Sequence, residues 1–166
     1  MPFSLLPKAQ MAKLTDITAE QLRRWGVKLL MLDFDNTIVP YTTNQPTEEM
    51  EIWLREMNGL PDIKLCIVSN SRNDRVPKFC RERGMEVITH AKKPFPKGIR
   101  ECLEKYGMRP EEAALVGDQI FTDTLGANGS GVRSVLVEAI HNHNFWLKAR
   151  HVLELPFIFL ARNRRM

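Results

Sequence analysis

A short apolar run that ends in two acids constrains the fold of this chain most strongly. Residues 29–32 read Leu-Leu-Met-Leu and are followed by Asp33 and, one residue further on, Asp35. An uninterrupted apolar run of this kind is typical of a parallel strand that is covered on both faces. In open α/β sheets, ligands bind beyond the carboxyl ends of the strands. Because alternate side chains of a strand share a face, both carboxylates can address one site, unless the chain turns between them and the acids cap that turn.

The rest of the chain alternates strand-like and helix-like segments. Apolar runs predict further strands at residues 63–68, 85–89, 113–116 and 132–137. Apolar residues at helical spacing predict helices between Thr18 and Gly26 and at residues 47–57, 73–83 and 99–106. This alternation favours an α/β fold, with a doubly wound parallel sheet of about five strands and right-handed crossovers. The length of 166 residues fits a single domain.

Polar side chains follow four of the five predicted strands. Asp33 and Asp35 follow the first strand, Ser69 follows the second, Lys93 comes shortly after the third, and Asp118 follows the fourth. The carboxyl ends of parallel strands lie along one edge of the sheet. We therefore expect these side chains to converge on one site.

Simpler roles are open for several of these residues. Ser69 can cap the helix that follows it, and Asp118 can be a turn residue. Asp123 can supply acidic charge to the first turn of a helix. Lys93 lies in a proline-rich loop, where Lys92 or Lys97 is near enough to take its place. Only the arrangement of these residues in space decides between the alternatives.

Three carboxylates, a hydroxyl and a lysine suit the transfer of a phosphoryl group. Magnesium takes oxygen ligands and keeps several waters, so one or two carboxylates and a substrate oxygen suffice to hold it. A carboxylate can attack phosphorus to form an aspartyl-phosphate, and a second acid can protonate the leaving alkoxide and then activate water. Lysine and magnesium would neutralise the phosphoryl oxygens. The glycine-rich residues 126–131 contain no Gly-Lys-Ser or Gly-Lys-Thr, so we interpret them as a tight connection and not as a nucleotide cradle.

Four motifs in this order resemble those of the haloacid dehalogenase-like (HAD) phosphatases. They are Asp-Phe-Asp-Asn-Thr at 33–37, Ser69 after a strand, Lys93-Pro94, and Gly-Asp-Gln-Ile-Phe-Thr-Asp at 117–123. The Asp-Asn-Thr, Ser-Asn-Ser and Gly-Asp-Gln sequences are similar to the YqeG-type subfamily IIIA, which includes mitochondrial phosphatidylglycerophosphate (PGP) phosphatases. The opening Leu-Pro segment and the Asp-Ile-Thr sequence before the first helix are similar too. The resemblance covers about residues 28–137, the expected core of one HAD-like domain at residues 1–166.

The resemblance implies separate roles for three of the acids. Asp33 would be the nucleophile and a magnesium ligand. Asp35 would be the general acid and base, with its backbone carbonyl also on the metal. Asp118 would be a further magnesium ligand. The second acid, Asp35, argues for a phosphatase rather than a dehalogenase, which lacks it.

The same resemblance implies which residues bind the phosphoryl group. Ser69 and the backbone amide of Asn70 would donate hydrogen bonds to it. Lys93 would bridge the nucleophile and the phosphate, while Asp123 would support this lysine or a metal-bound water. Asn36 and Thr37 would shape the turn after the first strand.

Cap domains select small substrates in many HAD enzymes, and this chain has little room for one. Between Thr37 and Ser69 there is space for one loop and one helix before the strand, and between Ser69 and Lys93 for one helix and one strand. We therefore expect a capless enzyme with an open active site. Open sites in this family generally act on large substrates or are roofed by a partner subunit. PGP or another large phosphorylated substrate, and an oligomer, are the corresponding expectations.

An apolar and basic tail at about residues 144–166 suggests contact with an anionic surface. From residue 148 onward Glu154 is the one acid, and the basic residues are Lys148, Arg150, Arg162, Arg164 and Arg165. The apolar residues among them form no run long enough to span a bilayer, but they could lie on one. The commoner alternative is that they pack on the sheet as a closing helix.

Composition restricts the cellular setting and the partners. Cys66, Cys80 and Cys102 lie in apolar-patterned segments and are expected to be buried free thiols, which fit a reducing compartment. The start of the chain lacks signal-peptide features, so we expect a cytoplasmic protein with peripheral membrane contact through the tail. The net charge of +4 is mild and no aromatic-basic stacking surface is evident, so nucleic acid is not an expected partner.

Two other functions fit part of the pattern. A receiver-like module would accept a phosphoryl group on an aspartate as a signal, without being an enzyme. In such a module the aspartyl-phosphate persists, whereas Asp35 should hydrolyse it here. A phosphatase of protein or nucleic-acid phosphate would use the same residues as a lipid phosphatase and is the second alternative.

Overall fold

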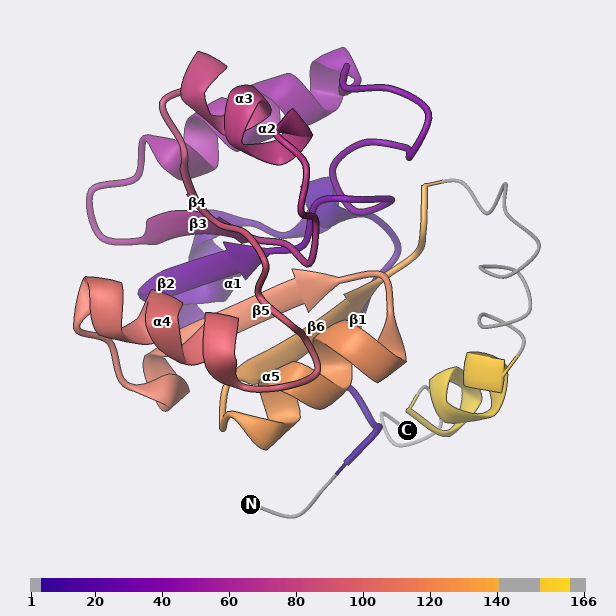
Figure 1. The fold of residues 1–166 in the computed structure, drawn as a ribbon. Helices are drawn as coiled ribbons and strands as arrows, with labels where there is room; N and C mark the ends of the chain where they lie inside the picture. Colours follow the sequence, from indigo (N-terminus) through magenta and orange to yellow (C-terminus); the bar gives the residue numbers. More distant parts are fainter. Residues whose placement is uncertain (1–3, 141–152, 162–166) are drawn as a thin grey trace.

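The computed structural model of the chain describes residues 4–140 and 153–161. Its centre is a parallel sheet of six strands in the order β1-β6-β5-β2-β3-β4 (Figure 1). The strands are β1 (Ala9–Met11), β2 (Leu29–Leu32), β3 (Lys64–Val68), β4 (Glu86–Ile88), β5 (Ala113–Gly117) and β6 (Arg133–Val137). The doubly wound α/β sheet expected from the sequence is confirmed, with one strand more than the five that were predicted.

Helices connect successive strands. They are α1 (Ala19–Arg24), α2 (Glu48–Asn58), α3 (Arg75–Glu82), α4 (Lys97–Tyr106), α5 (Leu125–Gly129), the 3-10 turns η1 (Leu14–Asp16) and η2 (Pro110–Glu112), the π-helix η3 (Ile120–Thr124), and a helix at 153–161. Two helix starts follow directly from sequence signals. The hydroxyls of Thr18 and Thr47 accept hydrogen bonds from the backbone N–H groups of Gln21, at 3.1 Å, and Met50, at 3.2 Å.

The central strand β2 explains why the apolar run is uninterrupted. Leu30 and Leu32 pack in one core with residues of α1, α2 and α3, whereas Leu29 and Met31 pack in a second core with residues of α4 and α5. Figure 1 shows α2 and α3 on one face of the sheet and α4 and α5 on the other. Each side of the strand is therefore buried, and the run has no polar face.

The sixth strand, β1, was not predicted from the sequence. It pairs in parallel with β6 at the edge of the sheet, with Ala9 opposite Val135. Three residues are too few to show a periodicity of two, so the pattern gave no signal. The three cysteines are buried free thiols, as expected.

The interpretation of residues 126–131 as a tight connection was wrong for most of the stretch. The chain is helical from Ile120 through Gly129, in η3 followed by α5. Glycine serves close packing here: a Cβ at Gly126 would lie 3.2 Å from Cδ1 of Ile99 and 3.4 Å from the backbone of Pro94. The small residue lets α5 approach α4 and the loop that carries Lys93.

Within residues 4–140, no domain is inserted between the elements of the sheet. The connection from β2 to α2 spans residues 33–47, and the one from β4 to α4 spans residues 89–96. The capless architecture expected from the sequence is confirmed for this part of the chain.

The expected tail is described in part. The 153–161 helix packs on η3, where the rings of Phe121 and Phe157 meet edge to face at 6.5 Å, and on β1, where Gln10 donates to the carbonyl of Ile158 at 3.3 Å. Packing on the domain is therefore confirmed for this helix. Residues 144–152 and 162–166 of the tail lie outside the described residues. No helix of the described chain is long and apolar enough to cross a membrane.

Candidate active site

The strand order fixes where a ligand can bind. From β2 the chain adds β3 and β4 on one side, and β5, β6 and β1 lie on the other. Ligands of open α/β sheets bind where the order reverses, beyond the carboxyl ends of the strands. Asp33 follows β2 and Asp118 follows β5, the two strands at this switch point, and Ser69 follows the neighbouring β3. The predicted site residues therefore come to one edge.

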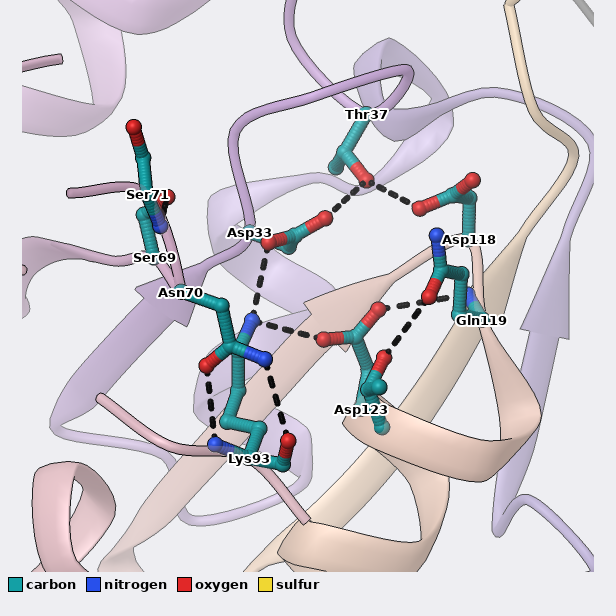
Figure 2. A network of polar contacts seen from close by, with 10 residues as sticks. Asp33, Thr37, Ser69, Asn70, Ser71, Lys93, Asp118, Gln119 and Asp123 are labelled. Atoms are coloured by element: carbon teal, nitrogen blue, oxygen red, sulfur yellow. Dashed lines mark hydrogen bonds and ion pairs between the residues drawn. The ribbon is translucent and has the colours of Figure 1, made fainter. Parts of the chain in front are cut away.

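The ammonium group of Lys93 lies at the centre of this edge (Figure 2). Its Nζ is 2.8 Å from Oδ1 of Asp33 and 2.7 Å from Oδ1 of Asp123. Burial opposes the charge on this side chain, but the carboxylates of Asp123 and Asp33 outweigh it and raise the pKa of Lys93 above its usual value. Lys92 and Lys97 are exposed. The structure thus selects Lys93 among the three candidate lysines.

The loop that carries Lys93 is held by the side chain of Asn70. Its Oδ1 accepts from the backbone N–H of Lys93 at 2.8 Å, and its Nδ2 donates to the Lys93 carbonyl at 3.0 Å (Figure 2). This role of the amide was not predicted, because the sequence analysis considered the backbone of Asn70 alone. Ser69 does not cap α3, whose N-cap is Asp74. Its Oγ accepts from the backbone N–H of Ser71 at 3.1 Å.

Three carboxylates gather beside Lys93. Asp33, Asp118 and Asp123 each offer an oxygen, and these oxygens lie within 4.8 Å of one another. The Thr37 hydroxyl lies 3.3 Å from Asp118 and 3.5 Å from Asp33, and its single proton can serve one of them at a time. Burial and the charge of Asp33 raise the pKa of Asp118 well above its usual value. The same causes, opposed by Lys93, raise the pKa of Asp123 to about 7.

This donor set fits a divalent cation. The cluster holds more carboxylates than the one ammonium group can neutralise, and oxygen ligands are those that magnesium prefers. A cation beside Asp33 and Asp118 would remove the charge repulsion that raises the pKa of Asp118.

Gly117 is required by the position of Asp123. A Cβ at this glycine would overlap the Asp123 carboxylate. Asp123 also accepts from the backbone N–H of Gln119 at 3.2 Å, at the start of η3. The two roles considered for Asp123, support of the lysine and charge at a helix start, therefore occur together.

Asp35 lines the same cavity as Asp33 but points to Arg75. The Arg75 guanidinium donates to Oδ1 of Asp35, and its Nη2 donates to the carbonyls of Pro40, at 2.9 Å, and Thr43, at 2.6 Å. Burial raises the pKa of Asp35, and the hydrogen bond and charge of Arg75 oppose that rise. Arg75 thus orients Asp35 and ties it to the loop before α2.

Arg75 was missed in the sequence analysis. It lies at the start of α3, 40 positions from Asp35, where an arginine is ordinary on a solvated helix face. Its distinguishing feature is that only 18% of its side chain is exposed, which no local pattern reveals. A search for basic residues in the first turn after each predicted strand-end motif would have included it.

A cavity of about 530 Å³ opens above these groups. Asp33, Asp35 and Lys93 form part of its wall, and the remaining polar wall residues include Ser69, Asn70, Arg72, Arg75, Gln119 and Thr122. Asp118 and Asp123 are buried and do not line it. The arrangement places a carboxylate, a buried ammonium group and hydrogen-bond donors around one cavity.

Comparisons with known proteins agree with this chemistry. Residues 1–140 match the family model described as mitochondrial PGP phosphatase. The probable phosphatase YqeG of Bacillus subtilis is 33% identical over 132 residues, which cover 80% of this chain and 76% of that protein. Phosphatidylglycerophosphate phosphatase 1, chloroplastic/mitochondrial, of Arabidopsis thaliana is 30% identical over 179 aligned positions. That match covers 95% of this chain and 48% of the plant protein, so the chain spans about half of its length.

Solved structures share the fold at low sequence identity. A hypothetical protein from Xanthomonas campestris superposes with a TM-score of 0.58 at 18% identity, covering 90% of this chain and 80% of that one. The 3-deoxy-D-manno-octulosonate 8-phosphate phosphatase of Yersinia pestis superposes with a TM-score of 0.52 at 17% identity, covering 81% and 76%. These likenesses concern the fold alone.

Replacing Asp118 by Asn tests the charge repulsion in the carboxylate cluster. Asn keeps the shape and an acceptor for Thr37 but removes one buried charge, so Asp118→Asn should raise Tm in metal-free buffer at pH 8. A gain of about 1 kcal/mol raises Tm by about 2–4 °C in a chain of this size. Added magnesium should raise the Tm of the wild type and leave Asp118→Asn nearly unchanged. Differential scanning calorimetry measures both effects.

The matched control for this prediction is Glu104→Gln, because Glu104 is exposed on α4. It should follow the wild type with and without magnesium. An Asp118→Asn variant that is less stable than the wild type without metal, yet gains as much from magnesium, would contradict the assignment of this cluster.

Proposed function

The chain belongs to the mitochondrial PGP phosphatase family of HAD-like phosphatases, and from this membership we propose that it is a magnesium-dependent phosphomonoesterase with Asp33 as nucleophile. The observation that carries the proposal is the buried ammonium of Lys93, held between Asp33 and Asp123 beside a carboxylate cluster. A nucleophilic carboxylate next to a fixed positive charge is the arrangement that phosphoryl transfer needs. Phosphatase activity itself follows from the family.

The proposed reaction has two steps. In the first, a carboxylate oxygen of Asp33 attacks phosphorus, the bond to the leaving alkoxide breaks, and Asp35 gives the alkoxide its proton. In the second, Asp35 takes a proton from water, which attacks the phosphorus of the aspartyl-phosphate and releases inorganic phosphate and free Asp33. The pKa of Asp35, raised by burial, favours a carboxyl group that can give and take a proton.

The surrounding residues would bind and orient the phosphoryl group. Lys93 places positive charge beside Asp33, and Asp123 keeps that lysine in position. The Ser69 hydroxyl and the Asn70 backbone amide would donate hydrogen bonds from the cavity wall. When bound, a magnesium ion held by Asp33, Asp118 and the backbone carbonyl of Asp35 would neutralise phosphoryl oxygens.

The proposed substrate is PGP or another large phosphomonoester. An open polar cavity without a cap, in a member of a family described by PGP hydrolysis, supports a phosphate on a bulky carrier. A phosphatase of protein or nucleic-acid phosphate remains the alternative, whereas membership in a phosphatase family weighs against a receiver-like module. Action as an oligomer, and a cytoplasmic location with peripheral membrane contact, are part of the proposal, although the plant relative is named for the chloroplast and mitochondrion.

Phosphate release from a panel of phosphomonoesters, including PGP, tests this function. The wild type should release phosphate only with magnesium, and Asp33→Asn should lower kcat by at least about 10³-fold, since the nucleophile is lost. Asp62→Asn, which alters an exposed ion pair with Arg23, is the matched control and should keep wild-type turnover. Magnesium-dependent turnover that survives Asp33→Asn would remove Asp33 from its proposed role.

Leaving-group dependence tests the assignment of Asp35 and Arg75. An alkyl phosphate needs a proton on its leaving oxygen, whereas p-nitrophenolate leaves readily without one. Asp35→Asn should therefore lower the rate of the first step, measured as leaving-group release in a single turnover, by about 10²–10⁴-fold for an alkyl phosphate and much less for p-nitrophenyl phosphate. Arg75→Gln should show the same selective loss in weaker form, because Arg75 positions Asp35.

Arg72→Gln is the control for this comparison, since Arg72 is an exposed arginine on the wall of the same cavity. It should not distinguish the two leaving groups. If Arg75→Gln lowers the first-step rate for both phosphates by the same factor, Arg75 supports the fold and does not position the acid.

A further inference from the structure

One helix presents an apolar face that the described residues leave uncovered. In the 153–161 helix, Leu153, Leu155, Phe159 and Leu160 are 66%, 47%, 64% and 53% exposed. At 3.6 residues per turn these four fall on one side, whereas the buried Glu154 and Ala161 fall on the other. Half of the exposed large apolar side chains of the described chain lie in this short segment. Such a concentration marks an interaction surface.

Glu154 fixes this helix to the domain. It is 2% exposed, and its Oε1 accepts from the backbone N–H groups of Ile120, at 3.0 Å, and Phe121, at 3.4 Å. A carboxylate at the start of η3 is favourable, because it meets N–H groups that have no partner within that helix. The inward position of Glu154 also removes the one acid of residues 148–166 from the exposed face.

The helix lies next to the candidate active site. Gln119 and Thr122 line the cavity, and Phe121, between them in sequence, packs against Phe157. The segment from Gln119 to Asp123 therefore contacts the cavity and Lys93 as well as the 153–161 helix.

We propose that the apolar face of the 153–161 helix docks on an anionic lipid membrane beside the active site. This inference rests on the proposed action on a phospholipid and names the surface on which that substrate is met. The exposed side chains of the helix carry no acid, and Arg162, Arg164 and Arg165 follow directly in the sequence. Apolar side chains flanked by arginines match an anionic lipid surface, which accepts them without a shaped partner pocket.

Charge also distinguishes this partner from a second copy of the chain. Two tails that each carry five basic residues and one buried acid would repel one another when their apolar faces meet. Anionic lipid headgroups attract the same residues. The membrane is therefore the occupant that both the apolar face and the basic sequence favour.

Vesicle binding by the full chain tests the proposal. Cosedimentation would use vesicles of phosphatidylglycerol and phosphatidylcholine, with pure phosphatidylcholine for comparison. The double variant Leu153→Ser with Phe159→Ser changes two exposed side chains and should lower affinity for the anionic vesicles by at least about tenfold. The wild type should bind the neutral vesicles about tenfold more weakly than the anionic ones. The control is Ile52→Ser, at a 47% exposed apolar residue of α2, which should bind like the wild type.

The outcomes separate docking from the proposed catalytic function. Turnover of p-nitrophenyl phosphate on the same samples reports on phosphatase activity, and vesicle binding is measured without turnover. Binding by the double variant as tight as that of the wild type would overturn the proposal, as would an equal loss in Ile52→Ser. A double variant that keeps vesicle binding but loses self-association in analytical ultracentrifugation would assign the face to a second copy and also overturn it.

Discussion

The ion pairs of Lys93 with Asp33 and Asp123 are the interaction on which the site depends. They join the end of β2, the helix η3 and the loop after β4, at 2.8 and 2.7 Å, inside a buried environment. A buried ammonium is tolerated only when carboxylates compensate it, and removing one partner leaves an uncompensated charge. Two further residues support this arrangement. Gly117 leaves space for the side chain of Asp123, and the side chain of Asn70 holds the Lys93 backbone.

Much of this arrangement could be predicted from local sequence. Strands buried on both faces appear in the sequence as continuous apolar runs, and the carboxyl ends of parallel strands lie at one edge of the sheet. The sequence alone therefore predicts that Asp33, Lys93 and Asp118 lie close together. The helix starts at Thr18 and Thr47 were also predictable, because each depends on a hydrogen bond between the threonine and a backbone N–H three residues further on. The functional roles given to the site residues rest on resemblance and on this geometry, and they stay predictions.

The features that escaped prediction depend on contacts between distant segments. Arg75 and Asp35 are 40 positions apart in the sequence, and Glu154 and Ile120 are 34 apart. The sequence around each residue does not indicate its partner. β1 is too short for periodicity and owes its place to β6. The helix through 126–129 was hidden because glycine usually signals a turn, while here Gly126 permits close approach to Ile99.

The proposed mechanism requires Asp33 to carry the phosphoryl group during the reaction. The most direct measurement is acid quenching of the Asp35→Asn variant mixed with p-nitrophenyl phosphate and magnesium, followed by mass spectrometry of its peptides. A good leaving group lets the intermediate form, and loss of Asp35 slows its hydrolysis. The expected product is a peptide heavier by one phosphoryl group, with the modification on Asp33. A modification on Ser69 or Asp123, or none on any residue while p-nitrophenolate is released in a burst, would contradict it.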